Sequence, residues 1–305
     1  MTTKILRILA LTLLLGTLGA AQAFAQGLPI YNNIPNPLPG NLPSVGYEAT
    51  GTAEFGDRVQ FSAGSGRSLT AVVQTMSSWG CQNGHWFSGD CVTSPGATFS
   101  HPITLNIYSV GASNAVGALI GTVTQTFAIP YRPSADNVNC TGGKWFDGTN
   151  CFNGYAVTIT FNLSGLTVPN QAIYGIAYNT THFGYAPIGE SAACFTSSGS
   201  CGYDSLNVAT VAVPPTVGVN PAPDDAYYNS VFGSNYCDGG LGGVNIFRLD
   251  AGCWTGFKPA VRFNAANAPL TANDCKQGGW QSRTNAAGQT FPNQGQCIQY
   301  VNTGK

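Results

Sequence analysis

Charge is scarce in this 305-residue chain, because Asp, Glu, Lys and Arg together make up only 8% of it. Globular domains usually carry about 25% of such residues, so the surface must be built mainly from Ser, Thr, Asn, Gln and Gly. The sequence also lacks a basic patch that could neutralise phosphates, which argues against nucleic acid as a partner. Neutral polar ligands such as glycans are compatible with this composition.

Motifs for metal binding and nucleophilic catalysis are missing too. His85, His101 and His182 are the only histidines, none of them spaced as a ligand pair, and no Cys-x-x-Cys occurs, so no zinc site is predicted. A Gly-x-Ser-x-Gly nucleophile elbow is also absent. After the first 25 residues no stretch reaches the roughly 20 apolar residues that a spanning helix needs, so the mature chain is predicted to have no membrane span.

The first 25 residues have the pattern of a secretory signal peptide. Lys4 and Arg7 precede an apolar run at 8–18, and Ala23-Phe-Ala25 is a small-x-small cleavage site. We expect the mature chain to start near Gln26, with cleavage after Ala23 as the alternative. Removing Lys4 and Arg7 leaves 10 basic residues against 13 acidic ones, a net charge of −3. The pattern predicts a secreted, extracellular protein.

The 10 cysteines fit this prediction, because they form local couples in the sequence. In an oxidising compartment such couples are most simply disulfides, although other connectivities stay open. A bond that closes a loop of about ten residues stabilises the fold by about 2–3 kcal/mol in the chain-entropy model. The predicted pairs are Cys81 with Cys91, Cys140 with Cys151, Cys194 with Cys201, Cys237 with Cys253, and Cys275 with Cys297.

The unit Cys-x-x-Gly-x-Trp occurs three times, and every tryptophan of the chain lies within five residues of a cysteine. The copies begin at Cys81, Cys140 and Cys275, and the first two continue as Trp-Phe-x-Gly. An exposed aromatic pair on a rigid loop can stack on sugars or dock a protein. The alternative is that the rings fold back and plug the end of the fold beside their own disulfide. The ligand-binding candidates are Trp86, Phe87, Trp145 and Phe146.

Short strands are predicted over most of the chain, and no window has a helical period. Apolar and polar residues alternate at 103–108 and 155–162, the period of a half-buried strand. Further candidates, rich in Val, Ile, Thr and aromatic residues, are 57–62, 69–76, 118–128, 171–178, 206–213, 226–233, 244–249 and 259–264. The pattern predicts an all-β protein, an antiparallel β-sandwich of jelly-roll type with local disulfides and a small C-terminal cystine module.

Composition then divides the mature chain. Residues 26–46 are rich in proline and predict an extended leader or edge segment rather than a helix. The sandwich is predicted at 47–266, a linker of small residues at 267–273, and a compact disulfide module at 274–305. A second Pro-rich stretch at 213–223 is interpreted as a long loop inside the sandwich, because strand signals resume on both sides.

The C-terminal module carries a resemblance. It reads Asp274-Cys-Lys-Gln-Gly-Gly-Trp280 and later Phe291-Pro-Asn-Gln-Gly-Gln-Cys297. This resembles a Cys-Lys-x-Gly-Gly-Trp…Asn-Gln-Gly-Gln-Cys motif that ends many secreted bacterial proteins, mostly actinobacterial. The body is similar to secreted β-sandwich proteins of the same bacteria, in stretches such as 129–136 and 234–240. The resemblance implies a secreted, surface-associated protein and no particular activity. Since a Leu-Pro-x-Thr-Gly signal is absent, covalent attachment to the wall by a sortase is not expected.

Acidic residues supply the catalytic and metal candidates. Hydrolysis of a glycoside needs two acids across a cleft, one of them with a raised pKa, and Glu190 with Asp204 is the pair hardest to dismiss. An ester-hydrolysing reading of Tyr203-Asp204-Ser205-Leu206 would need His182 or His101 as its base. No cofactor is expected, except that calcium sites in β-sandwiches gather loop carboxylates. The calcium candidates are Glu54, Asp57, Asp224 and Asp225, with solvated turn acids as the alternative.

These observations favour a non-enzymatic protein for recognition or surface structure, with polysaccharide or cell wall as the expected ligand. The alternative is a secreted hydrolase acting on polysaccharide or ester substrates. A third class, a structural coat protein, predicts self-assembly; the sequence leaves the oligomeric state open. A binding module needs exposed aromatic rings, whereas a hydrolase needs a proton-transfer group positioned in a cleft.

Overall fold

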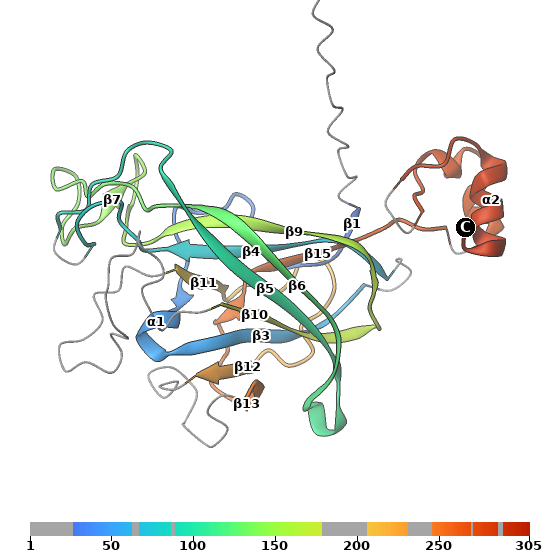
Figure 1. Cartoon of the computed structure of the whole chain (residues 1–305), viewed down its shortest axis with the longest axis horizontal. Helices are drawn as coiled ribbons and strands as arrows, with labels where there is room; N and C mark the ends of the chain where they lie inside the picture. Colours follow the sequence, from blue (N-terminus) through green and yellow to red (C-terminus); the bar gives the residue numbers. More distant parts are fainter. Residues whose placement is uncertain are drawn as a thin grey trace, which may run out of the picture.

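The computed structural model describes residues 27–62, 67–86, 89–178, 206–230, 246–269, 271–285 and 289–305. In these ranges antiparallel strands form two large sheets and one two-stranded ribbon, which confirms the predicted all-β sandwich (Figure 1). The predicted signal peptide lies outside the described residues. Among the helices of the described part, none has the length and apolar character that a bilayer crossing requires.

The first sheet has seven strands and is organised around the long strand β4, Ser68–Ser78. One side of β4 pairs with β9, Tyr155–Thr167, and its other side pairs first with β15 and then with β11. The remaining strands extend this second side. The strands of this side are β1 (Leu28–Asn32), β2 (Ser44–Val45), β11 (Leu206–Val211), β14 (Lys258–Pro259) and β15 (Val261–Ala265).

The second sheet has six strands in the order β13-β12-β3-β10-β5-β6. Its edge is a long hairpin whose tip is the short 3-10 helix η1, Ala112–Asn114. In Figure 1 this hairpin runs diagonally across the strands of both sheets. The bounds are β3 (Thr52–Gln60), β5 (Thr98–Val110), β6 (Val116–Pro130), β10 (Gln171–Ala177), β12 (Asp225–Ser230) and β13 (Arg248–Ala251).

Aromatic side chains fill the space between the sheets. The ring of Tyr174 in β10 meets that of Phe263 in β15 edge to face, with centroids 5.2 Å apart. At the open side Phe127 of β6 meets Phe161 of β9 at 5.0 Å in the same way. Offset and edge-to-face contacts of this kind add to the stabilisation that burial itself provides. The core is therefore continuous from one sheet to the other.

The Pro-rich leader belongs to the sandwich in the structure. Its strand β1 pairs with β15, and Ile30 and Tyr31 are fully buried in the core. The predicted start of the sandwich at residue 47 therefore differs from the observed one. The prolines of this segment weaken its strand pattern in the sequence. Pro29 is nevertheless tolerated in the structure, because β1 lies at the edge of its sheet.

The C-terminal residues form a second, small cluster around the disulfide between Cys275 and Cys297. Its longest element is α2, Gln294–Thr303, which no helical pattern predicted. The Asn293 side chain caps its first turn, and Gly304 ends it in the left-handed conformation. Figure 1 shows this module as a compact body joined to the sandwich by one connecting segment. The other helical turns are α1 (Tyr47–Thr50), η4 (Ala272–Cys275) and η5 (Gly279–Gln281).

Three predicted disulfides are confirmed, namely 81–91, 140–151 and 275–297. Cys253 is disulfide-bonded as well. Cys194, Cys201 and Cys237 lie outside the described residues.

Candidate functional site

The first two disulfide loops meet at one end of the sandwich. The Cys81–Cys91 loop follows β4, and the Cys140–Cys151 loop precedes β9. Because Ser78 at the end of β4 pairs with Tyr155 at the start of β9, the chain leaves one strand and enters the other at the same place. Two copies of Cys-x-x-Gly-x-Trp, far apart in the sequence, therefore become neighbours. This region surrounds the label β7 in Figure 1.

Buried Arg132 holds the two loops together. Its backbone N–H donates to Gly80 O at 2.9 Å, and its Nη2 donates to Gly143 O at 2.6 Å. The Asn137 side chain adds a bond from Nδ2 to Gly89 O at 3.2 Å. A guanidinium suits this task because its donors point in fixed directions. The loop cluster is thus cross-braced by hydrogen bonds as well as closed by disulfides.

The glycine of the repeated unit has a backbone role in all three copies. Gly84, Gly143 and Gly278 adopt φ values of +71°, +69° and +82°, which side chains other than glycine rarely allow. At Gly143 the two loops also touch, because a Cβ atom there would lie 2.3 Å from Trp86 O. The shared position of Gly in the three copies therefore reflects a tight left-handed turn rather than a catalytic group.

The two tryptophans of these loops have different surroundings. Trp145, in the ribbon strand β7 (Trp145–Phe146) that pairs with β8 (Cys151–Phe152), is only 6% exposed. Its Nε1 donates to Gly154 O at 2.7 Å, and its ring packs against Phe152 and Tyr155. This is the plug arrangement that the sequence left as an alternative.

Trp86 is half-buried and lies against the ring of Trp79, which is not among the predicted ligand-binding residues. Its centroid is 4.9 Å from that of Trp79, and the two planes meet at 80°. Trp79 Nε1 donates to Ser77 Oγ at 3.0 Å, and Ser77 Oγ donates to Asn41 Oδ1 at 2.7 Å. The chain of hydrogen bonds fixes the Trp79 ring and brings the leader to the site.

Around this pair lies an open groove with a volume of about 590 Å³. Trp79, Trp86 and Phe152 supply aromatic surface, while Asn41, Asn153 and Lys144 supply polar groups. The Asn153 Oδ1 atom is buried and has no hydrogen-bond partner within the described part of the chain. Such an acceptor is costly unless something else satisfies it. The lining is completed by Leu42, Pro43, Ser44 and Cys151.

Phe146 lies elsewhere, although it follows Trp145 directly. It lines a second groove of about 720 Å³, together with Tyr131, Tyr155 and several prolines. Phe87 lies outside the described residues. Of the four predicted ligand-binding residues, the structure therefore places Trp86 in the groove beside Trp79, and Trp145 and Phe146 beside the second groove. Trp79 sits two residues before Cys81, the one sequence signal that could have selected it.

The calcium candidates do not gather around a common point. Among the residues described, no group of three or more His, Cys, Asp or Glu side chains could hold a metal ion. Glu54 is 8% exposed and accepts hydrogen bonds from Asn106 Nδ2 at 2.9 Å and Tyr108 Oη at 3.1 Å. Burial raises the pKa of its carboxyl. Its partners are therefore hydrogen-bond donors of β5, which is separated from β3 by β10.

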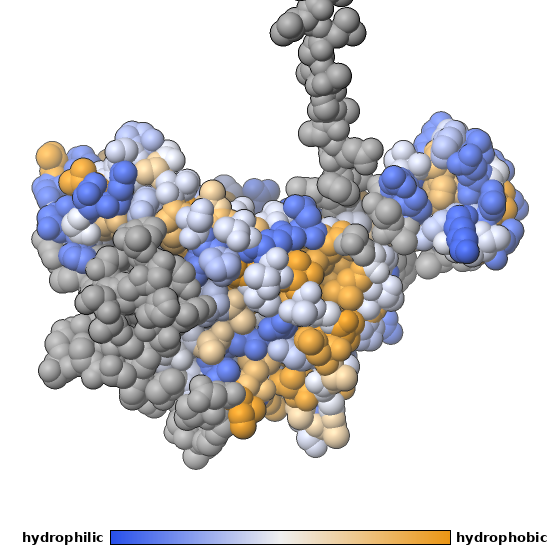
Figure 2. Space-filling view, in the orientation of Figure 1, coloured by the Kyte–Doolittle hydropathy of each residue, from blue (hydrophilic) through white to orange (hydrophobic). Residues whose placement is uncertain are grey.

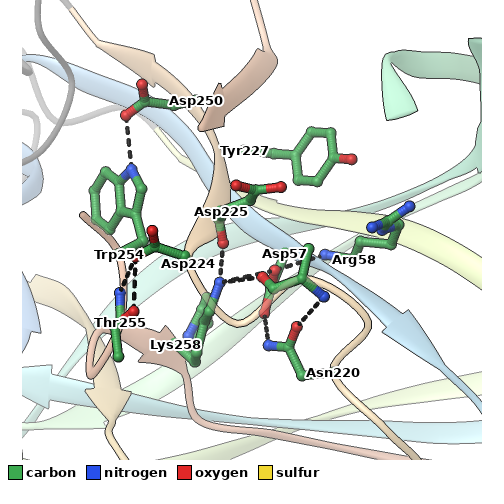
Figure 3. A network of polar contacts seen from close by, with 12 residues as sticks. Asp57, Arg58, Asn220, Asp224, Asp225, Tyr227, Asp250, Trp254, Thr255 and Lys258 are labelled. Carbon is green, nitrogen blue, oxygen red and sulfur yellow. Dashed lines mark hydrogen bonds and ion pairs between the residues drawn. The ribbon is translucent and has the colours of Figure 1, made fainter. Parts of the chain in front are cut away.

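Asp57, Asp224 and Asp225 lie in a different polar network, beside the middle of β3 (Figure 3). Asp57 is buried beside the Lys258 ammonium, with 3.5 Å between Oδ1 and Nζ. Burial raises the Asp57 pKa to about 6, although Lys258 opposes the shift. Asp224 is exposed and accepts from Thr255 Oγ1 at 2.7 Å, which lowers its pKa. The Lys258 ammonium is thus the positive charge beside Asp57.

The catalytic candidates Glu190 and Asp204 lie outside the described residues, as does His182. His101 is 1% exposed and packs between Phe99 and Tyr178. Burial lowers its pKa to about 4, so it is a neutral core histidine at ordinary pH.

Comparison of the chain with protein-family models, with curated proteins and with solved structures found no match. What the groove can bind must therefore be argued from its own residues.

Proposed function

We propose that this protein is a secreted, non-enzymatic recognition protein that binds a neutral polysaccharide in the groove around Trp79 and Trp86. The observation that carries the proposal is the perpendicular pair of half-buried indole rings in an open groove. One ring presents its face where the other presents its edge. Aromatic faces pack well against the C–H faces of sugar rings, and a perpendicular neighbour limits where a sugar ring can lie.

The polar groups of the groove support a sugar rather than a purely apolar ligand. Asn41 and Asn153 offer amide groups, which both donate to and accept from hydroxyls. Lys144 is the single charged side chain among the described lining residues. A neutral glycan matches this lining better than a polyanion does.

Rigidity also favours binding. Trp79 is fixed through Ser77 and Asn41, and Trp86 sits in a loop closed by the Cys81–Cys91 disulfide. A preformed site avoids part of the ordering cost that binding usually includes. The disulfides also fit an extracellular location, which the N-terminal pattern of the sequence predicts.

The test is retention on insoluble glycans and cell walls by the mature protein and two variants, Trp86→Ala and Trp79→Ala. We expect either variant to weaken binding at least tenfold, because tryptophan contacts at a binding centre often contribute about 2 kcal/mol or more. Leu119→Ala is the matched control, since Leu119 is 54% exposed at the far end of the β5–β6 hairpin. If both tryptophan variants fold and bind like the control, the groove is not the site.

A further inference from the structure

Two side chains from different parts of the fold meet at the buried carboxylate of Asp57. Asp57 comes from β3, Lys258 from β14, and Asn220 from the Pro-rich loop at 213–223. Lys258 Nζ lies 3.5 Å from Asp57 Oδ1, and Asn220 Nδ2 lies 2.7 Å from Asp57 Oδ2. Figure 3 shows the amine and the amide reaching the same carboxylate from two sides. An amine, an amide and a proton carrier are thus brought together.

The loop that carries Asn220 is fixed in place. Val219 and Gln60 exchange two backbone hydrogen bonds of 2.9 Å, and Thr216 N donates to Asn32 O at 2.7 Å. Gly218 approaches the backbone so closely that a Cβ would lie 2.7 Å from Gln60 O. Asn220 therefore reaches the Asp57 carboxylate from a backbone held on both β1 and β3.

The carboxylate and the amine are buried beside aromatic rings, whereas Asn220 is partly exposed and, with Lys258, lines a pocket of about 430 Å³. Asp57 is 1% exposed and Lys258 is 6% exposed. Charge on Asp57 raises the pKa of both Tyr31 and Tyr174, in addition to the larger effect of their burial. A buried ion pair is costly to desolvate, so a reaction that removes both charges is favoured in such a place.

We propose that Lys258 and Asn220 become joined by an intramolecular isopeptide bond, with Asp57 as the proton carrier. Nζ loses a proton to Asp57 Oδ1 and attacks Asn220 Cγ with its lone pair, so that a C–N bond forms. The electrons of the Asn220 carbonyl bond move to Asn220 Oδ1. When they return, the Cγ–Nδ2 bond breaks, and Asp57 Oδ2 delivers a proton to the leaving nitrogen, which departs as ammonia.

The protons and charges of this step balance without any further reagent. Nζ gives up two protons to Asp57, of which one leaves with the ammonia and one stays on the carboxyl. The ammonium and the carboxylate are thereby replaced by a neutral amide and a neutral acid. The raised pKa of Asp57 fits that final protonated state. No oxidant or metal is needed.

The backbone near Asn220 supports the same reaction. The N–H of Ala222 donates to Asn220 Oδ1 at 3.0 Å, where negative charge develops as the amine attacks. Lys258 Nζ also donates to Ala222 O at 3.1 Å, which holds the amine beside this turn. Residue 221 is a proline, and without an N–H it cannot attack the Asn220 side chain to form a succinimide.

The experiment is mass spectrometry of the mature protein after complete reduction of its disulfides. We expect the mass to be lower than the sequence requires by one ammonia molecule. Trypsin cuts after Arg248, which separates Asn220 from Lys258, so peptides 145–248 and 249–262 should stay joined. A reduced protein with the full sequence mass and separate peptides would overturn the proposal.

Three variants assign the chemistry. Asn220→Ala and Lys258→Arg remove the two reacting groups, and each should yield two separate peptides. Asp57→Asn keeps the shape but removes the proton carrier. This variant should therefore keep the side-chain amide of Asn220, show no loss of ammonia in its mass, and yield two separate peptides. If Asp57→Asn is linked as completely as the wild type, Asp57 is not the proton carrier. An N-terminal Gln26 can also lose one ammonia by cyclising, so the joined peptides of the wild type decide whether the bond exists. Poor folding of a variant therefore leaves the test intact.

Discussion

The side-chain amide of Gln125 pairs with the backbone of Asn162 as a strand would. Gln125 Nε2 donates to Asn162 O at 2.9 Å, and Gln125 Oε1 accepts from Asn162 N at 3.3 Å. Gln125 lies in β6 and Asn162 in β9, the edge strands of the two sheets on this side. One glutamine thus closes the open side of the sandwich and satisfies backbone groups that would otherwise attract another strand.

Replacing Gln125 by Glu should therefore destabilise the protein by about 1–2 kcal/mol. The substitution keeps an acceptor but removes the donor, and it places a carboxylate against the Asn162 carbonyl. The measurement is chemical unfolding at neutral pH. Thr126→Ala is the matched control, because Thr126 is exposed on the next position of β6. Equal stabilities of the two variants would mean that the Gln125 bonds contribute nothing.

Apolar side chains flank this seam. Gly121 approaches Leu166 so closely that a Cβ would lie 2.7 Å from its Cδ2 atom, and Ile120 and Val123 pack on the core from the same strand. Figure 2 shows apolar surface over the β5–β6 hairpin. The seam therefore combines one polar bridge with close apolar packing.

Gly143 offers a test of how the disulfide loops support the groove. We expect Gly143→Ala to weaken glycan binding and stability together, because its Cβ would collide with Trp86 O and push that loop away. Gly142→Ala is a matched control: its φ of +68° is nearly the same, but its Cβ would meet nothing within 4 Å.

Both variants bear the strain of a left-handed alanine, about 1–2 kcal/mol. Any additional loss in Gly143→Ala reports the contact between the loops. Binding by pull-down and stability by thermal unfolding give the two readouts. Similar values for the two variants would show that loop contact does not position Trp86.

Sequence alone was sufficient where local pattern and tertiary environment agree. The alternation at 103–108 and 155–162 predicts strands, and these residues lie within β5 and β9. The cystine pairs followed from spacing for the same reason, since a loop of ten or eleven residues closes easily. In these segments each residue's surroundings are set by its neighbours in the chain.

Elements that depend on distant partners could not be predicted. Strand β1 forms because β15 pairs with it, whereas its own residues predict only an extended leader or edge segment and do not identify the partner strand. Helix α2 has little helical signal beyond the Asn293 cap and Gly304, and it is held by packing on the Cys275–Cys297 disulfide. The groove likewise joins Asn41 to Trp79 through Ser77, a contact between segments that no spacing links.

The buried carboxyl of Glu54 should give stability a distinctive dependence on pH. Burial raises its pKa in the folded state above the unfolded value of 4.5. The folded protein then holds the proton more tightly, so this stabilising contribution is present below pH 4.5 and is lost as pH rises through the folded pKa. The free energy of unfolding should therefore fall with rising pH in that window.

Glu54→Gln keeps an acceptor for Asn106 and Tyr108 and cannot ionise, so the difference between wild type and variant isolates this residue from Asp57. The expected result is a wild type that loses more stability than the variant as pH rises above 4.5. Asp136→Asn gives the opposite sign, because hydrogen bonds from Asn139 lower the Asp136 pKa. A pH-independent difference for Glu54→Gln would show that its carboxyl is not perturbed.

The C-terminal module should unfold without the sandwich when its disulfide is removed. Its described apolar cluster is small, consisting of Cys275, Cys297 and Phe291 with a few partly buried neighbours. A disulfide of this size contributes about 2–4 kcal/mol, and a ten-residue helix is marginal alone. The double variant Cys275→Ser with Cys297→Ser should therefore lose α2, seen as rapid proteolysis after Lys276 and Arg283. The main thermal transition should stay unchanged, because the sandwich core contains no residue of the module.

Cys140→Ser with Cys151→Ser is the contrasting control, which should weaken glycan binding and leave the module protected from protease. A main transition lowered by the tail variant would show instead that module and sandwich unfold as one unit.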